Sequence, residues 1–168
     1  MRKILALALA TLLVCAFAGT ANARLVKGKA EDFHHALQLC YQHSADHAQA
    51  LFDQIMNGEL NMRIVKDYVE QIGNDLDHAR TYHSFVHKSY SEEDSKMIAA
   101  EHLVVLNGNN AAATAFAALK TEIEKPKPDL ATIKTLTTAV YDGSSKAAAA
   151  HREVMKKLGI PDAKNPDA

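Results

Sequence analysis

Cysteine is scarce in this chain, which has two, Cys15 and Cys40, among 168 residues. Cys15 lies in a segment that we expect to be removed, so the mature chain keeps Cys40 alone and cannot form an intramolecular disulfide. Its stability must therefore come from a hydrophobic core. Cys40 itself can be interpreted as a small buried hydrophobe, as an intermolecular bridge or as a metal-binding thiolate.

Long apolar runs are missing everywhere except at the N-terminus. There, Arg2 and Lys3 precede an almost uninterrupted apolar segment over 4–18, and the small residues of 21–23 follow it. This order is typical of a cleaved signal peptide, and the segment is too short for an ordinary membrane span. We therefore predict a signal peptide over 1–23, a periplasmic or secreted location, and a mature chain of 145 residues that starts at Arg24 and forms one domain.

The mature chain has no excess of positive charge. With residues 1–23 removed, 17 basic residues face 20 acidic ones, which leaves a net charge of −3. A nucleic-acid partner would require a basic face, and a membrane span a longer apolar run, so neither is expected. A nucleophile motif, a glycine-rich phosphate loop and HExxH are also missing, which disfavours an enzyme.

What the mature chain does contain is apolar residues three or four positions apart, with few of the alternating runs of β-strands. Asn107-Gly108-Asn109-Asn110 is a turn signal, but the apolar phase continues through it, so we predict one helix there. Four helices are expected: one over 30–56 ended by Asn57-Gly58, a second capped by Asn61, a third opened by a Ser91–Asp94 capping box and broken by Pro126, and a fourth capped by Asp129 and ended by Gly159.

Helices of similar length joined by short links favour antiparallel neighbours. The sequence therefore predicts an all-α domain over 24–160, an up-down-up-down four-helix bundle, followed by a disordered tail over 161–168. Gly73, Gly108 and Gly143 fall at nearly one level of this bundle. Because glycine weakens a helix, their coincidence indicates either close backbone packing or room for a cofactor.

The nine histidines are distributed unevenly along this predicted bundle. When the helices are folded back at their links, eight of the nine fall in the half nearer the link between the second and third helices, or at mid-height for His43, and His47 lies just beyond. Four of them occupy the predicted apolar stripes, one on each helix: His47, His83, His102 and His151. A buried imidazole needs hydrogen-bond partners or a metal ion, so the pattern predicts a transition-metal site.

The levels decide which histidines are the preferred ligands. His102 and His151 fall at the same level, so we expect them to form the centre of the site, completed by His83, His43 or Cys40. The His43-x-x-x-His47 and His83-x-x-x-His87 pairs each place two imidazoles on one helical face. They differ by roughly 20 Å in height at 1.5 Å per residue, so they should not share one ion. The pairs left over from the central site could form a second or peripheral site, or be ordinary surface histidines.

The leading interpretation is an exported bundle that sequesters, buffers, transports or senses copper, zinc or nickel. The position of His151 near the end of the last helix is similar to that of the haem ligand in the exported four-helix cytochromes of the b562 type. That resemblance implies a b-type haem electron-transfer protein as the alternative. Their axial methionine in the first helix has no counterpart here, so two histidines would be needed. A structural or chaperone-like bundle with hydrogen-bonded histidines is another alternative, and a metalloenzyme or a pH-sensitive histidine cluster is left open.

Overall fold

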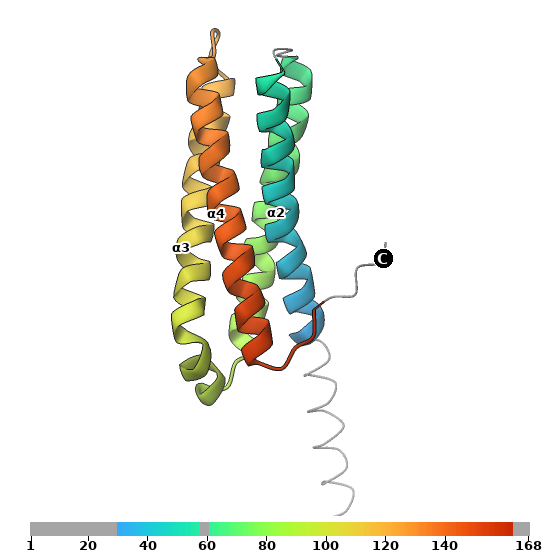
Figure 1. Ribbon diagram of the computed structural model, residues 1–168, viewed down its shortest axis with the longest axis vertical. Helices are drawn as coiled ribbons and strands as arrows, with labels where there is room; N and C mark the ends of the chain where they lie inside the picture. Colours follow the sequence, from blue (N-terminus) through green and yellow to red (C-terminus); the bar gives the residue numbers. More distant parts are fainter. Residues whose placement is uncertain (1–29, 58–60, 163–168) are drawn as a thin grey trace, which may run out of the picture. The chain divides into compact units, whose positions relative to one another are not determined.

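The computed structural model describes residues 30–57 and 61–162. The predicted signal peptide, the glycine expected to end the first helix and the tail after Asp162 lie outside these residues. The chain separates into two compact units, with the boundary between Asp32 and Phe33. The description below concerns the unit that begins at Phe33. Throughout the described ranges the regular structure consists of four helices and no strand (Figure 1). The predicted all-α class and four-helix bundle are confirmed.

Three of the four helices begin directly after the capping residues that the sequence predicts. The first helix covers residues 30–56, α2 Met62–Ser89, α3 Glu92–Ile123 and α4 Leu130–Lys157. The side chain of Asn61 accepts from the amide of Arg63 at 3.0 Å, and that of Asp129 accepts from the amide of Thr132 at 3.0 Å. At α3, Ser91 and Asp94 form the reciprocal capping box. Each cap supplies an acceptor for an amide that has no partner within its helix.

The predicted turn signal at 107–110 does not interrupt α3, which is helical through it. Gly108 faces α4 where the two backbones approach most closely: a Cβ atom added at Gly108 would lie 2.8 Å from the carbonyl oxygen of Gly143. A Cβ atom added at Gly143 would in turn lie 2.7 Å from the amide nitrogen of Ala112. Of the two interpretations of these glycines, close backbone packing is therefore the correct one here.

The core consists of two clusters of buried side chains. The first, which we call the apolar cluster, lies in the half toward the α3–α4 loop and comprises Ala48, Leu51, Ile55, Val65, Val69, Ile72, Leu76, Ala112, Ala115, Leu119, Ile123, Ile133 and Val140. The second lies toward the α2–α3 link and comprises Leu37, Cys40, Tyr41, Ala79, Val86, Ile98, Val105, Ala147, Ala148 and Val154. The predicted histidine-rich half of the bundle coincides with the second cluster.

The apolar spacing of the first helix predicts a buried face, and five of its seven side chains are buried as expected. The predicted residues are Phe33, Leu37, Cys40, Ser44, His47, Leu51 and Ile55. Phe33 and His47 were expected in the stripe, but both are only partly buried, whereas His34, Tyr41 and Ala48 are 1%, 0% and 0% exposed. Both sets have a helical spacing on adjacent faces, so periodicity alone could not separate them. Neighbours on both sides bury the second set: His34 contacts the α4 residue His151. The prediction that four stripe histidines are buried was therefore wrong for His47, His83 and His102, which are partly exposed.

Contacts between helices fix their relative directions locally. Gly73 on α2 faces Phe116 on α3, and ten residues later His83 faces His102. Residue numbers therefore rise along α2 as they fall along α3. No helix within the described ranges has the length and apolar character required to cross a membrane.

Candidate functional site

An imidazole pair links α2 to α3 near the end drawn at the bottom of Figure 1. His83 Nε2 lies 3.0 Å from His102 Nε2, and the two rings are stacked with their centroids 5.1 Å apart. Counted along the sequence from the predicted links, His83 lies about five residues from the level of His102, or roughly 7 Å at 1.5 Å per residue. They meet because side chains lean toward the N-terminus of their own helix, and those termini point in opposite directions at this contact.

A third imidazole stands beside this pair. His87 lies one helical turn after His83, and its ring centroid is 6.2 Å from that of His83 and 5.5 Å from that of His102. Its side chain is exposed, so it can rotate. Tyr90, the residue that ends α2, lies against the same group, with its ring 6.0 Å from His102 and 6.2 Å from His87. The predicted His83–His87 pair and His102 thus lie together.

A second imidazole pair is fully buried between the first helix and α4. His34 Nδ1 lies 3.1 Å from His151 Nε2, and the two side chains are 1% and 2% exposed. The other ring nitrogen of His151 donates to the side-chain oxygen of Gln38 at 3.1 Å. Tyr90 also contacts His34, at 5.7 Å between ring centroids, so this tyrosine adjoins both pairs.

Burial keeps these imidazoles neutral. Desolvation, reinforced by the charge of a neighbouring imidazole, lowers the pKa of His34 to about 4 and that of His151 to about 3. The same two causes lower the pKa of His83 to about 4, and they also lower the pKa of His102. Proton binding therefore does not compete with a metal ion for these nitrogens near neutral pH, because the neutral ring is the form that ligates metals.

The other predicted ligands lie elsewhere. His47 donates from Nδ1 to Asp75 Oδ2 at 2.8 Å, and His43 is exposed with its ring centroid 6.3 Å from that of His47. Cys40 is 8% exposed, and burial, followed by the charge of Asp75, raises the pKa of its thiol to about 11. A thiol held protonated agrees best with the interpretation of Cys40 as a small buried hydrophobe.

Predicted and observed pairings differ in one respect. We expected His102 and His151 to be direct partners, whereas the structure pairs His102 with His83 and His151 with His34. They remain close enough that the charge of His102 contributes to the lowered pKa of His151. Across 30–57 and 61–162, no group of three or more His, Cys, Asp or Glu side chains already converges so as to hold a metal ion.

His34 is the residue that sequence reasoning missed. Its height, counted from the predicted links, matches that of His83, but the predicted apolar stripe contains its neighbour Phe33 and not His34. The signal that could have identified it is the spacing of His34, Leu37 and Tyr41, which follows the three-four rule of a buried face.

Two more polar groups make this region unusual. The side-chain nitrogen of Gln38 and the hydroxyl of Tyr41 are buried and have no hydrogen-bond partner within the described part of the chain.

Comparison of the chain with known protein families, with curated proteins and with solved structures found no significant match. Function must therefore be inferred from the site itself.

Proposed function

We propose that the protein is an exported four-helix bundle that binds one transition-metal ion, copper, zinc or nickel, and carries or buffers it. His83, His87 and His102 are the proposed ligands. The observation that supports this most strongly is the spacing of the three imidazole rings, whose centroids lie 5.1, 5.5 and 6.2 Å apart.

The spacing agrees with the geometry of metal coordination. A zinc–imidazole bond of about 2.0–2.1 Å places the ring centre roughly 3.2 Å from the ion, so two rings at a tetrahedral angle have centres about 5.2 Å apart. The His83–His102 and His87–His102 distances are near this value. The longer His83–His87 distance requires only a rotation of the exposed His87 ring. Water would occupy the remaining position, as in an exchangeable site.

The buried His34–His151 pair is not assigned an ion in this proposal. Gln38 accepts from Nδ1 of His151, so Nε2 of His151 accepts from the Nδ1–H of His34, and the two facing nitrogens are occupied by this hydrogen bond. His151, predicted as a ligand from the sequence, is therefore not among the three proposed ligands.

Export and topology belong to the same proposal. The charged, apolar and small-residue segments over 1–23 support removal of a signal peptide and a periplasmic or secreted location. The up-down-up-down arrangement is supported by the pairing of residue numbers between neighbouring helices. They rise and fall in opposite senses between α2 and α3, and the same holds between α3 and α4, where Glu101 meets Lys157 and Gly108 meets Ala147.

Metal binding by purified protein tests the proposal. Full-length protein, expressed with its own N-terminus and purified, is stripped of metal and titrated with Zn(II), Ni(II) and Cu(II) in the presence of a competing chelator. We expect one tightly bound ion per chain. His102→Ala and His83→Ala should each weaken that binding by roughly 100-fold or more, because each removes one of three ligands. His78→Ala, an exposed histidine of α2, is the matched control and should bind as the wild type does.

Two results would contradict the proposal. One is protein that contains no metal as isolated and takes up none of the three ions. The other is unchanged affinity in both ligand variants, with helix content confirmed by circular dichroism. A red protein with a Soret absorption band would instead identify the haem alternative.

A further inference from the structure

A third histidine environment lies apart from the His83–His102 and His34–His151 pairs. His47 on the first helix donates from Nδ1 to Asp75 Oδ2 on α2, with the two atoms 2.8 Å apart. The two side chains are 31% and 15% exposed, so the pair is partly shielded from water. This is a cross-helix carboxylate–histidine pair, and the proposed metal site does not use it.

The hydrogen bond determines which nitrogen of His47 can bind a ligand. A carboxylate only accepts, so Nδ1 must carry the proton, and Nε2 of the neutral ring carries the lone pair. A carboxylate behind the protonated nitrogen also holds the ring in place and makes the other nitrogen more basic. Asp75 therefore prepares His47 Nε2 as a metal ligand.

A second imidazole is within reach one helical turn away. His43 precedes His47 by four residues, so both lie on one face of the first helix, with ring centroids 6.3 Å apart. Two rings bound to one ion have centres about 5 Å apart, given metal–nitrogen bonds of about 2.0–2.1 Å. His43 is exposed, so a change of its rotamer can close that gap.

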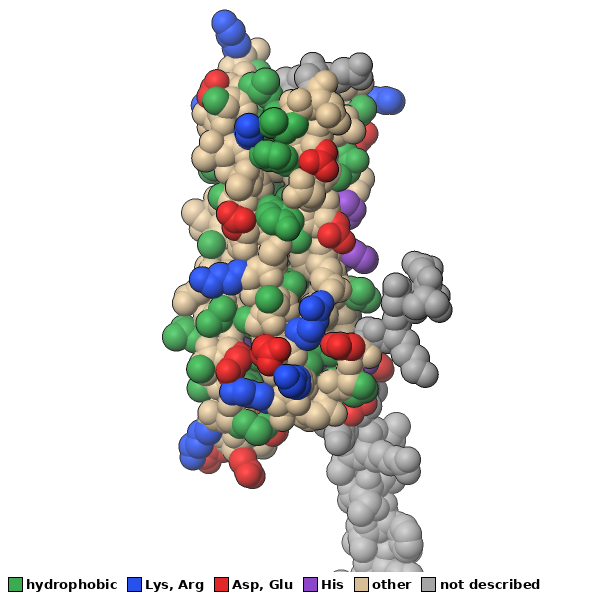
Figure 2. Space-filling view, viewed as in Figure 1, with side chains coloured by type: hydrophobic (Ala, Val, Ile, Leu, Met, Phe, Trp, Pro, Cys, Tyr) green, Lys and Arg blue, Asp and Glu red, His purple; other side chains and the backbone are tan. Residues whose placement is uncertain are grey.

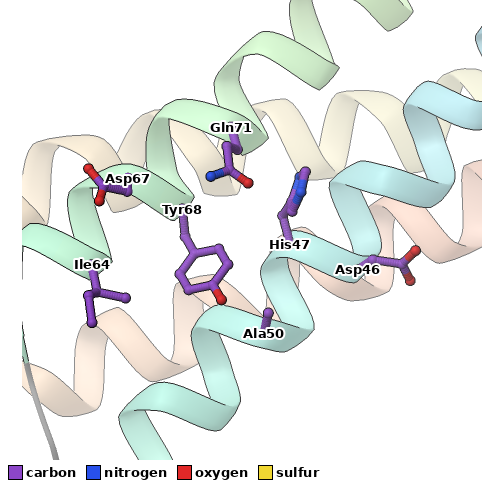
Figure 3. Close-up of a pocket in the computed structure, with 7 residues that line it drawn as sticks. All are labelled: Asp46, His47, Ala50, Ile64, Asp67, Tyr68 and Gln71. Atoms are coloured by element: carbon purple, nitrogen blue, oxygen red, sulfur yellow. The ribbon is translucent and has the colours of Figure 1, made fainter.

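An open pocket of about 550 Å³ lies beside His47 (Figure 3). His47 and Tyr68 are among its lining residues, which come from the first helix and α2, and their rings lie 6.5 Å apart. Asp46 and Asp67 also line it, so the surroundings carry negative charge that favours a cation. The pocket leaves space for the water molecules that a metal with two protein ligands must keep.

The geometry points to a second, weaker metal site for Cu(II), with His43 and His47 Nε2 as ligands and Asp75 as the residue that positions His47. Copper is the preferred occupant because two imidazoles and water suit its tetragonal geometry, and because complexes with nitrogen ligands are most stable for Cu(II) among the divalent ions. Zinc usually requires three or four protein ligands, so it should bind here much less tightly.

This site shares no residue with the proposed carrier site. The two His-x-x-x-His pairs are separated by roughly 20 Å along the bundle at 1.5 Å per residue, so one ion cannot bridge them. Substitutions at His43, His47 or Asp75 and substitutions at His83 or His102 therefore test the two proposals separately.

Copper titration of the full chain provides the test. Cu(II) is added against a competing chelator and followed by electron paramagnetic resonance, and the wild type should bind two equivalents with distinct affinities and spectra. His47→Ala and the exposed His43→Ala should each remove the weaker equivalent and leave the tighter one unchanged. Asp75→Ala should weaken the second site by about 10–100-fold. Asp75→Asn, whose carbonyl can still accept from Nδ1, should recover part of that loss.

Three results would overturn the inference. The first is a wild type that binds no copper sensitive to His47→Ala or His43→Ala. The second is an affinity that does not change in Asp75→Ala, which would exclude the positioning role. The third is weak copper binding that is lost in His78→Ala, which would indicate adventitious surface histidines. If the carrier site is absent instead, the only equivalent bound will be insensitive to His102→Ala and sensitive to His47→Ala.

Discussion

The two ends of this bundle stabilise themselves in different ways. The end toward the α3–α4 loop is filled by the apolar cluster, in which side chains such as Leu51, Ile72 and Leu119 are fully buried. The opposite end buries His34, His151 and Gln38 among its apolar side chains. An apolar side chain gains free energy simply by leaving water, whereas a buried imidazole loses it unless its nitrogens find partners. The histidine end therefore depends on hydrogen bonds where the other end depends on apolar burial, and among the described residues its Gln38 nitrogen and Tyr41 hydroxyl have no partner.

The buried imidazoles at one end are not required by the fold. A core of leucine or valine at 34 and 151 would satisfy the fold without hydrogen bonds, so the imidazoles are not explained by packing. On the face drawn in Figure 2, charged side chains of both signs are scattered among apolar and other side chains, and few imidazoles are visible. Local departures from the requirements of folding are expected at functional sites, and here they gather at one end.

The largest expected effect comes from lowering the pH of metal-free protein. Because the pKa values of His34 and His151 are lowered to about 4 and about 3, the unfolded chain binds protons below pH 6.5 while the folded chain does not. Stability is then fully present above pH 6.5 and is lost as the pH falls. At pH 5 the loss should be about 2 kcal/mol for each of these rings. Urea unfolding at pH 7.5 and pH 5 measures it.

A double variant isolates the histidine contribution. In the His34→Leu, His151→Leu protein the difference in unfolding free energy between the two pH values should shrink by about 4 kcal/mol. The exposed His78→Leu variant should keep the wild-type pH dependence. An equal pH dependence in all three proteins would show that the histidine end does not control acid stability.

The next effect concerns the apolar end. Leu119→Ala leaves a cavity in the apolar cluster, where Leu119 is 0% exposed, and should lower the unfolding free energy by about 3 kcal/mol at pH 7.5. Zinc affinity of the folded variant should stay that of the wild type, because no ligand lies near this side chain. Leu103→Ala, at a position that is 57% exposed, serves as the control and should change stability little. Zinc binding that weakens in Leu119→Ala would contradict the independence of the two ends.

The smallest effect is expected near mid-height, between the two clusters. Ser44 and Ser144 share a buried hydrogen bond of 2.9 Å. Each single change to alanine leaves one buried hydroxyl without its partner and should cost about 1–2 kcal/mol. The double variant should cost less than the sum of the two, as a double-mutant cycle in urea will show. Additive costs would mean that water replaces the missing partner.

Much of the fold could be predicted because local signals agreed with one another. Asn61, Ser91 and Asp129 all cap helices as expected, since capping depends only on residues within one turn. Gly108 was harder to interpret. The residues around it favour a turn, but Gly108 lies in a helix because its lack of a side chain lets α4 pack closely against α3. The presence of a neighbouring helix cannot be inferred from the residues next to Gly108 in the sequence.

The candidate site could be predicted only as a region. Counting residues from the links located the histidine end correctly, because helical rise is constant. It could not show that His83 and His102 lean toward each other, or that the first helix turns His34 and not Phe33 into the core. Which side chains meet depends on the direction of each side chain and on how each helix is rotated about its axis. In a helix of 3.6 residues per turn, the side-chain direction changes by about 100° from one residue to the next, so a small error in rotation selects a different partner.

The close approach of α3 and α4 at Gly108 and Gly143 has a consequence for how an ion could leave. Backbones packed this tightly separate last, so local opening is expected to begin with the first helix or α2. Both imidazole pairs span that division, because His34 and His83 belong to the outer two helices and His151 and His102 to the tightly packed pair. If the proposed ion is bound, its release would therefore not require the whole molecule to unfold, since detachment of α2 would separate His83 and His87 from His102.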